Sequence, residues 1–350
     1  MSAARRACAA DLIERLRAAG FGPLTVVTSD SEFADGRPAS DIEVVSDVER
    51  PFHFGRSLAR VVEERRFERL AYFGGASAPL ATAHVLAAWR DQANQLGDDA
   101  VLVNNLHSTD WAILGSARRI GEFSDRLPTD NPLGWVLSRE GGLTVGMPPP
   151  TSAARTDIDT PGDLALLRHH PDLGPNLTRV MEAFPEHLAR RADALARVLR
   201  TPAESLALIG RVSEGTWRDL VQRTQIWVRV FAEERGMRAS GRLARGEVSS
   251  LLAEMVEERG AGPFVARLES LVGGVLWDTR VWMAHRGPWP GAADRMAADL
   301  GWAEEIGDPS LRALTEALRA SRIPILTGGQ GVVAGSLRAF VESVMPEKGL

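Results

Sequence analysis

The sequence has almost no lysine. Lys348, the third residue from the C-terminus, is the one lysine among the 41 basic residues of this 350-residue chain. A phosphate-binding P-loop and a pyridoxal-phosphate Schiff base both need a lysine inside the fold. We expect Lys348 to lie in a frayed tail, so the shortage argues against both chemistries.

Cysteine is equally scarce, since Cys8 stands alone and no internal disulfide can form. A single cysteine fits a reducing compartment, and its place on an expected N-terminal helix favours a structural role over a nucleophilic one. No apolar run approaches the roughly 18 residues of a membrane span. The N-terminus lacks the apolar stretch of a signal peptide. We therefore expect a soluble cytoplasmic protein without a membrane partner.

An excess of positive charge is also missing. The formal net charge is −5, with 18 arginines against 23 acidic residues in positions 1–170 and 23 basic against 23 acidic residues in positions 171–350. Neither half has the basic surface expected of a nucleic-acid-binding protein. The hydrophobic fraction of 44% and charged fraction of 25% are those of a globular protein, and the length predicts about two domains.

The first half alternates short apolar runs with helical stretches. Strands are expected at 24–28, 41–45, 70–73, 100–103 and 143–147, and helices at 3–19, 55–66, 80–95 and 131–139. Strands separated by helices of this length predict βαβ units and a mainly parallel sheet. Residues 1–170 are therefore expected to form a Rossmann-like α/β domain.

After residue 171 the pattern becomes helical. Leu188, Ala192, Leu195 and Leu199 recur at helical spacing, as do the apolar residues at 248–255 and 311–318. Asp308 before Pro309 is a typical helix start, and residues 201–204 (TPAE) read as a capping box. We expect an all-α domain at 176–350. Six of the nine tryptophans lie in it, which favours core or interface roles and a homo-oligomer formed through this half.

The segment at 156–164 (TDIDTPGDL) is the most informative. Thr160 is expected to cap a helix, with Pro161 as its first residue and Asp163 closing a capping box. This leaves Asp157 and Asp159, two positions apart in an extended approach and so facing the same side. Such a carboxylate can hold Mg²⁺ when phosphates complete the coordination shell.

This string resembles the closing motif of small nucleotidyltransferases, such as the molybdenum-cofactor cytidylyl- and guanylyltransferases and the phospholactate guanylyltransferases of the nucleotide-diphospho-sugar transferase superfamily (GT-A-like). Other pieces follow in that family's order over roughly the first half: 24–30 (LTVVTSD), 54–58 (FGRSL) and 70–80 (LAYFGGASAPL). The resemblance implies a Rossmann-like sheet, a nucleotide or nucleotide-sugar ligand and Mg²⁺ held by Asp159, with Asp157 beside it.

The chain departs from that pattern in two places. The family opens with a strand and a Gly-rich loop, whereas this sequence starts at the helix that should follow them. The family's first metal-binding aspartate falls on Ser77, and a neutral hydroxyl weakens a Mg²⁺ site. A less favoured alternative is a permuted arrangement in which residues 323–331 (IPILTGGQG) supply the opening strand and loop; a helix-connecting loop is the default.

Two polar segments are candidates for substrate binding. Residues 104–111 (NNLHSTDW) follow an expected strand, where ligands bind in open α/β sheets; the members we select are Asn104, Asn105, His107 and Asp110. The alternative, weighed evenly, is an Asx/Ser-rich turn joining two strands. Gly74, Gly75 and Ser77 could let a nucleotide approach the backbone closely, although a tight strand-to-helix turn explains them slightly better.

The helical half offers two weaker candidates. A carboxylate site built from Glu233 and Asp278 is conceivable, but salt-bridged helix faces are the favoured interpretation because the Glu-x-x-His spacing of di-iron bundles is absent. Asp278, Arg280 and His285 form a concentrated polar string to which the sequence assigns no reaction; they are the sole basis for a third hypothesis, an enzyme whose site is built by the helical half.

These features leave two main hypotheses. The first is a Mg²⁺-dependent nucleotidyltransferase in which Asp159 holds the metal and the loop 104–110 holds a small phosphorylated or hydroxylated acceptor. The second is a degenerate relative that binds a nucleotide or sugar without catalysis, or an oligomeric interaction protein. Ser77 and the missing loop favour the second hypothesis, whereas Asp157, Asp159 and the Asn-rich loop favour the first.

Overall fold

The computed structural model describes residues 1–36, 42–47 and 51–345. Lys348 and Asp41, the first residue of one expected strand, lie outside these ranges. The chain forms two compact units, which are treated separately below. The N-terminal unit is Ser2–Arg155 with Gly174–Leu177, and the C-terminal unit is Thr156–Leu173 and Thr178–Leu350 with Met1.

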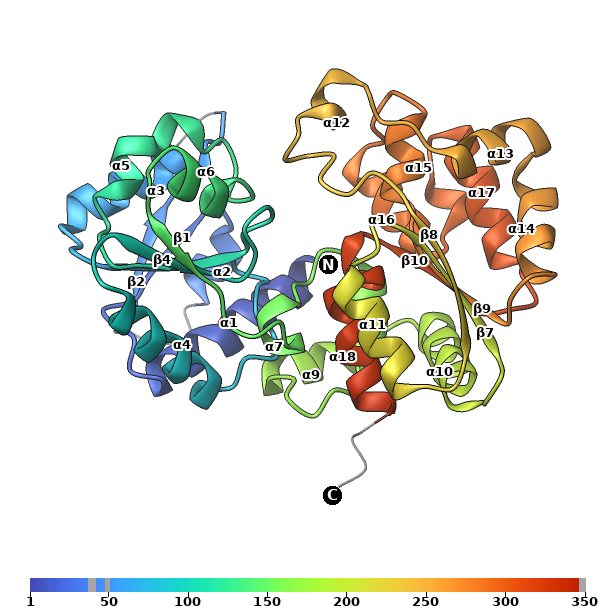
Figure 1. The fold of residues 1–350 in the computed structure, drawn as a ribbon, viewed down its shortest axis with the longest axis horizontal. Helices are drawn as coiled ribbons and strands as arrows, with labels where there is room; N and C mark the ends of the chain where they lie inside the picture. The colour runs from blue at the N-terminus through green and yellow to red at the C-terminus, as the bar shows by residue number, and fades with distance from the viewer. Residues whose placement is uncertain (37–41, 48–50, 346–350) are drawn as a thin grey trace. The chain divides into compact units, whose positions relative to one another are not determined.

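The N-terminal unit alternates helices and strands much as the sequence predicts (Figure 1). Its strands are β1 (Thr25–Thr28), β2 (Glu43–Ser46), β3 (Leu70–Phe73), β4 (Ala100–Val103), β5 (Trp111–Leu114) and β6 (Thr144–Gly146). Its helices are α1 (Ser2–Ala18), α2 (Ser31–Asp35), α3 (Phe54–Arg65), α4 (Ala83–Leu96), α5 (Arg119–Phe123), η1 (Ser124–Arg126), α6 (Leu133–Arg139) and α7 (Ser152–Arg155).

Four of these strands form a mixed sheet in the order β3-β5-β4-β6. β5 runs antiparallel to both β3 and β4, and β4 is parallel to β6. The expected sheet was mainly parallel and had no strand at β5. Because β3 and β4 run in the same direction on either side of β5, their carboxyl ends lie at the same edge.

Helices cover both faces of this sheet. Residues of α3 and α6 pack with Leu70, Val101 and Val103 on one face. Residues of α1 and α4 pack with Leu102 and Ile113 on the other. Successive residues of β4 thus bury on opposite faces, as expected of a strand with helices on both sides.

β1 and β2 form a separate parallel pair. In the part of the chain that the structure describes, β1 pairs with β2 alone and β3 with β5 alone, so each has an edge without a strand partner. The apolar side chains of β1 are incompletely covered, and Val27 is 38% exposed.

The C-terminal unit also contains a sheet (Figure 1). Its strands are β7 (Ser205–Gly210), β8 (Trp227–Ala232), β9 (Gly274–Asp278) and β10 (Ile325–Gly328). Its helices are α8 (Pro161–Leu167), α9 (Pro175–Met181, shared with the N-terminal unit), α10 (Glu186–Arg200), α11 (Glu214–Arg223), α12 (Arg242–Arg245), α13 (Leu251–Arg259), α14 (Ala261–Glu269), α15 (Arg280–His285), α16 (Ala292–Leu300), η2 (Ala303–Glu305), α17 (Pro309–Arg319), η3 (Gln330–Val333) and α18 (Gly335–Val344).

The expectation of an all-α second half is therefore wrong. The four strands are parallel, in the order β10-β9-β7-β8. Residues 201–204, read as a helix start, form the turn that enters β7, with Ala203 at a φ of +63°. The helices at α10, α13 and α17 are where the apolar spacing predicts them, and Asp308 caps α17 as expected.

The permuted arrangement is also excluded. Residues 325–328 pair in register with Val275–Asp278 of β9, inside the C-terminal sheet. They supply no partner for β1.

Both faces of the C-terminal sheet are buried. Leu206 and Leu208 of β7 pack with α8, α10 and α18. Ala207 and Ile209 of the same strand pack with α13, α14 and α17. The unit is a three-layer α/β/α structure, and a parallel sheet covered on both sides reads as continuous apolar runs without alternation.

Two features of the described residues bear on the exclusions drawn from the sequence. Cys8 is buried on α1 and forms no disulfide. Within residues 1–36, 42–47 and 51–345, no helix combines the length and apolar character needed to cross a membrane.

Candidate functional site

The Gly74–Ser77 segment forms a tight turn at the end of β3. The Ser77 hydroxyl donates to the Gly74 carbonyl at 2.7 Å, and its amide donates to the same oxygen at 2.9 Å. Ser77 is buried, whereas Gly75 is exposed. Because the Ser77 hydroxyl bonds within its own turn, it has the structural role that the tight-turn interpretation predicts.

The Asn104–Asp110 loop connects β4 to the antiparallel strand β5. It is therefore a turn joining two strands, which is one of the two interpretations that the sequence left open. The buried Asn104 amide donates to an Asp110 carboxylate oxygen at 2.6 Å and accepts the Asp110 backbone N–H at 2.9 Å. Asn105 accepts the backbone N–H of His107, and His107 itself is exposed. The loop is thus held by its own side chains.

These two predicted segments meet. The Gly74 amide donates to the Asp110 carbonyl at 3.0 Å, and a Cβ on Gly74 would lie 3.2 Å from that oxygen. Gly74, Ser77, Asn104 and Asp110 are therefore at the same sheet edge, as the carboxyl ends of β3 and β4 require.

Sequence reasoning missed Tyr72, Asp130 and Asn131 at this edge. The Tyr72 hydroxyl donates to Asp130 at 2.9 Å, and Ser108 donates to Asn131 at 2.9 Å. Burial, together with the charges of Asp130 and Asp110, raises the pKa of Tyr72 well above its usual value. Residues 130–132 (DNP) look like an ordinary helix start, so nothing in the sequence links them to β3.

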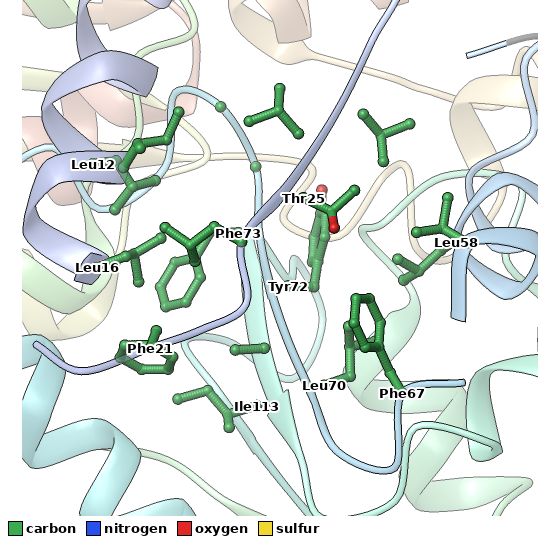
Figure 2. Close-up of a pocket in the computed structure, with 18 of the residues that line it drawn as sticks. Leu12, Leu16, Phe21, Thr25, Leu58, Phe67, Leu70, Tyr72, Phe73 and Ile113 are labelled. Carbon is green, nitrogen blue, oxygen red and sulfur yellow. The ribbon is translucent and has the colours of Figure 1, made fainter. Parts of the chain in front are cut away.

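A cavity of about 510 Å³ lies between β1 and β3 (Figure 2). Leu12 and Leu16 of α1 and Leu58 of α3 line its walls, with the aromatic rings of Phe21, Phe67 and Phe73. Phe21 and Phe73 meet edge to face, with ring centroids 6.0 Å apart. The cavity is mainly apolar, and it reaches Gly74 and Gly75 at the end of β3.

Asp157 and Asp159 belong to the C-terminal unit. Burial alternates along the segment: Thr156, Ile158 and Thr160 are buried, whereas Asp157 is half-buried and Asp159 exposed. This alternation agrees with two carboxylates on one side of an extended segment. Gly74, Ser77 and the Asn104–Asp110 loop belong to the N-terminal unit.

The capping box at the start of α8 is confirmed. Asp163 accepts the Thr160 backbone N–H and hydroxyl, each at 2.8 Å, and its other oxygen accepts the Ser336 hydroxyl at 2.9 Å. Complete burial, reinforced by the charge of Asp159, raises the pKa of Asp163 to about 7. This buried carboxyl group therefore titrates near neutral pH.

A second polar cluster lies at the carboxyl edge of the C-terminal sheet. Arg211 follows β7 and Asp278 ends β9, and Nε and Nη2 of Arg211 donate to the two Asp278 oxygens at 2.6 and 3.1 Å. Gly210 has a φ of +108°, and a Cβ there would lie 2.7 Å from the Asp278 Cβ. The close approach of the two strand ends thus requires glycine.

Arg280 extends this cluster into the protein. Its guanidinium forms a two-pronged ion pair with the buried Asp299. Despite burial, the charge of Asp299 raises the pKa of Arg280, which stays protonated. The sequence grouped Asp278, Arg280 and His285, but His285 accepts the Ser250 amide at 3.1 Å instead.

The suggested pairing of Glu233 with Asp278 is not formed. The Glu233 carboxylate accepts the Ser250 hydroxyl at 2.7 Å, whereas Asp278 is occupied by Arg211. Nor do these residues lie on helix faces, because Glu233 follows β8 and Asp278 ends β9.

Mg²⁺ can be tested against the side chains present. Among the described residues, no group of three or more His, Cys, Asp or Glu side chains is arranged to hold a metal. Mg²⁺ is usually bound by one or two carboxylates together with phosphates. Asp159 and Asp157 fit this role only together with a phosphorylated ligand.

The six tryptophans of the C-terminal unit differ in exposure, and Trp289 is partly buried. Trp277 and Trp282 are buried in the core, whereas Trp217, Trp227 and Trp302 are exposed, Trp227 by 72%. Trp227 begins β8, which is at the edge of its sheet. Homo-oligomerisation through this unit stays a prediction.

Comparison with known proteins gave no relative: no protein-family model, no curated protein and no solved structure matches the chain.

Proposed function

We propose that this protein is a nucleotidyltransferase-like protein whose N-terminal unit binds a nucleotide or nucleotide sugar in the cavity between β1 and β3. The observation that carries the proposal is the position of this cavity, which ends at Gly74 and Gly75 beside the Asn104–Asp110 loop. Ligand sites are typically apolar cavities of about 300–1,000 Å³ with a few polar groups at one end.

The lining has the chemistry that a nucleotide needs. Phe21, Phe67 and Phe73 offer aromatic surface to a base. β1 and β3 each have an edge that pairs with no strand in the described part of the chain, and these edges offer backbone N–H and C=O groups to its polar rim. Gly74 and Gly75 carry no side chain that would keep a phosphate or sugar from the backbone.

The transferase form of the proposal adds two assignments. Asp159, with Asp157 beside it, would hold Mg²⁺ together with phosphates, and the Asn104–Asp110 loop would hold the acceptor. Ser77 favours the non-catalytic form instead. A serine at this position supplies no carboxylate for a metal, and its hydroxyl is already hydrogen-bonded to the Gly74 carbonyl. Mg²⁺-dependent binding that is lost in Asp159→Ala supports transfer; Mg²⁺-independent binding supports the non-catalytic form.

Nucleotide pools and the single buried thiol both favour the cytoplasm as the location of this protein.

A peptide strand is the second candidate ligand. One extended apolar strand in the cavity would pair with the edge of β1 or β3 that has no strand partner among the described residues, and would also cover Val27. This occupant corresponds to an interaction protein rather than a nucleotide-binding one.

The test is equilibrium binding of the four ribonucleoside triphosphates, with and without Mg²⁺, to the full chain and to Thr25→Trp. Thr25 lines the cavity at the start of β1 (Figure 2), so the larger ring fills the space. Thr144→Trp is the matched control, at the exposed start of the edge strand β6 and outside the cavity. We expect binding that is lost in Thr25→Trp and kept in Thr144→Trp. Equal binding by both variants would contradict the assignment.

A further inference from the structure

The carboxyl edge of the C-terminal sheet has the position of a ligand site. β7 lies between β8 and β9, so the chain leaves β7 toward one side to form β8 and later returns on the other side to form β9. Ligands of open parallel sheets bind outside the carboxyl ends of strands where the chain divides in this way. Arg211 and Asp278 lie at that place.

Arg211 is held there in one orientation. Its Nε and Nη2 are occupied by Asp278, and its backbone N–H reaches the same carboxylate at 3.3 Å. Arg211 is only 9% exposed, and its Nη1 makes no hydrogen bond within the described residues. This nitrogen is nevertheless not fully buried. Nη1 therefore reaches the surface with its donors available.

A second arginine approaches from the segment after β8. Arg238 is exposed; its backbone carbonyl accepts the Gly241 amide, but within the described ranges its guanidinium makes no hydrogen bond or ion pair. Its guanidinium lies within electrostatic range of Arg211 and Arg280, as well as of Asp159 and Asp278. Partial burial of the guanidinium, followed by the charge of Arg211, lowers the pKa of Arg238. Two guanidinium groups within electrostatic range of each other, each with donors not used inside the protein, can bind one anion together.

We propose that Arg211 and Arg238 bind the phosphate group of a small phosphorylated molecule at the carboxyl ends of β7 and β9. The Asp278 carboxylate positions Arg211, and the segment after β8 brings Arg238 to the same anion. This phosphate site shares no residue with the nucleotide cavity of the N-terminal unit. The two proposals are therefore independent, and a negative result for phosphate binding would not count against nucleotide binding.

The experiment is calorimetric titration of the full chain with sodium phosphate and sodium pyrophosphate, and with malonate as a carboxylate of similar charge, at constant ionic strength. The test variant is Arg238→Gln, which removes an exposed side chain without breaking a bond. Arg235→Gln is the matched control, exposed on the same segment and outside the arginine cluster. We expect saturable phosphate or pyrophosphate binding that weakens at least tenfold in Arg238→Gln and is unchanged in Arg235→Gln.

Arg211→Lys provides a second variant that keeps the charge but loses the two-pronged contact with Asp278. We expect the same loss of affinity, with the fold checked by circular dichroism, and normal pyrophosphate binding by Thr25→Trp. The proposal is overturned by any of three results: no saturable phosphate binding, equal affinity in Arg238→Gln and the unaltered chain, or malonate binding as tight as pyrophosphate.

Discussion

Arg211 and Asp278 form a buried ion pair that joins the carboxyl ends of two adjacent parallel strands, although 67 positions separate them in the sequence. Asp278 is fully buried, and its oxygens also accept backbone N–H groups of Arg211 and Arg280. This carboxylate therefore organises the edge of the C-terminal sheet.

Removing the charge of Asp278 should be strongly destabilising. Asp278→Asn leaves the Arg211 guanidinium buried without a counter-ion, and breaking one partner of a buried pair costs about 3–5 kcal/mol. Urea denaturation measures the loss. The control is Glu140→Gln, which breaks an exposed pair with Arg126 and should leave stability nearly unchanged. Similar small losses in both variants would contradict this role.

A methyl group at position 210 should also disturb the strand ends. Gly210→Ala combines a positive φ with a Cβ placed 2.7 Å from the Asp278 Cβ, so we expect a loss of more than about 2 kcal/mol. Gly121→Ala, where a Cβ meets no atom within 4 Å, should change stability by less than about 1 kcal/mol. Thermal unfolding compares the two, and equal effects would argue against close strand approach.

Asp163 should make stability fall as the pH rises. Its folded pKa of about 7 exceeds the ordinary 3.8, so between about pH 4 and pH 7 the unfolded chain releases a proton that the folded chain keeps. The contribution to the free energy of unfolding decreases by up to roughly 4 kcal/mol over this window and is constant above it. In Asp163→Asn this slope should be absent. Denaturation at pH 4.5 and pH 8 compares the free energies of unfolding of the two proteins. The stability of Asp163→Asn relative to the unaltered chain should be higher at pH 8 than at pH 4.5; the same difference at both pH values would contradict a buried, protonated Asp163.

The N-terminal unit was largely predictable from the sequence. Its βαβ rhythm is local, so β3 and β4 were located to the residue, and Gly74, Ser77, Asn104 and Asp110 were selected as members of two separate candidate segments. β5 was missed because its four residues (WAIL) are compatible with helix, strand or loop, and only pairing with β3 and β4 decides between them.

The C-terminal sheet was not predicted, for a related reason. β7 contains Leu, Ala and Ile, which also suit helices, and both of its faces are buried, so it shows no alternation. Local patterns favoured helices, whereas pairing between residues such as Leu208 and Leu276 decides in favour of a sheet. Arg211 and Arg238 gave no signal, because only the strand order brings them together.

The most direct test of the account is hydrogen–deuterium exchange of the full chain with and without the nucleotide that binds best. Amides of β1 and β3 are expected to exchange readily in the free protein, because among residues 1–36, 42–47 and 51–345 each strand has an edge without a strand partner. Added nucleotide should slow exchange at residues 25–28 and 70–75 and leave the edge strand β6 unchanged. Protection confined to other segments, or no change at these residues under saturating nucleotide, would contradict the nucleotide site between β1 and β3.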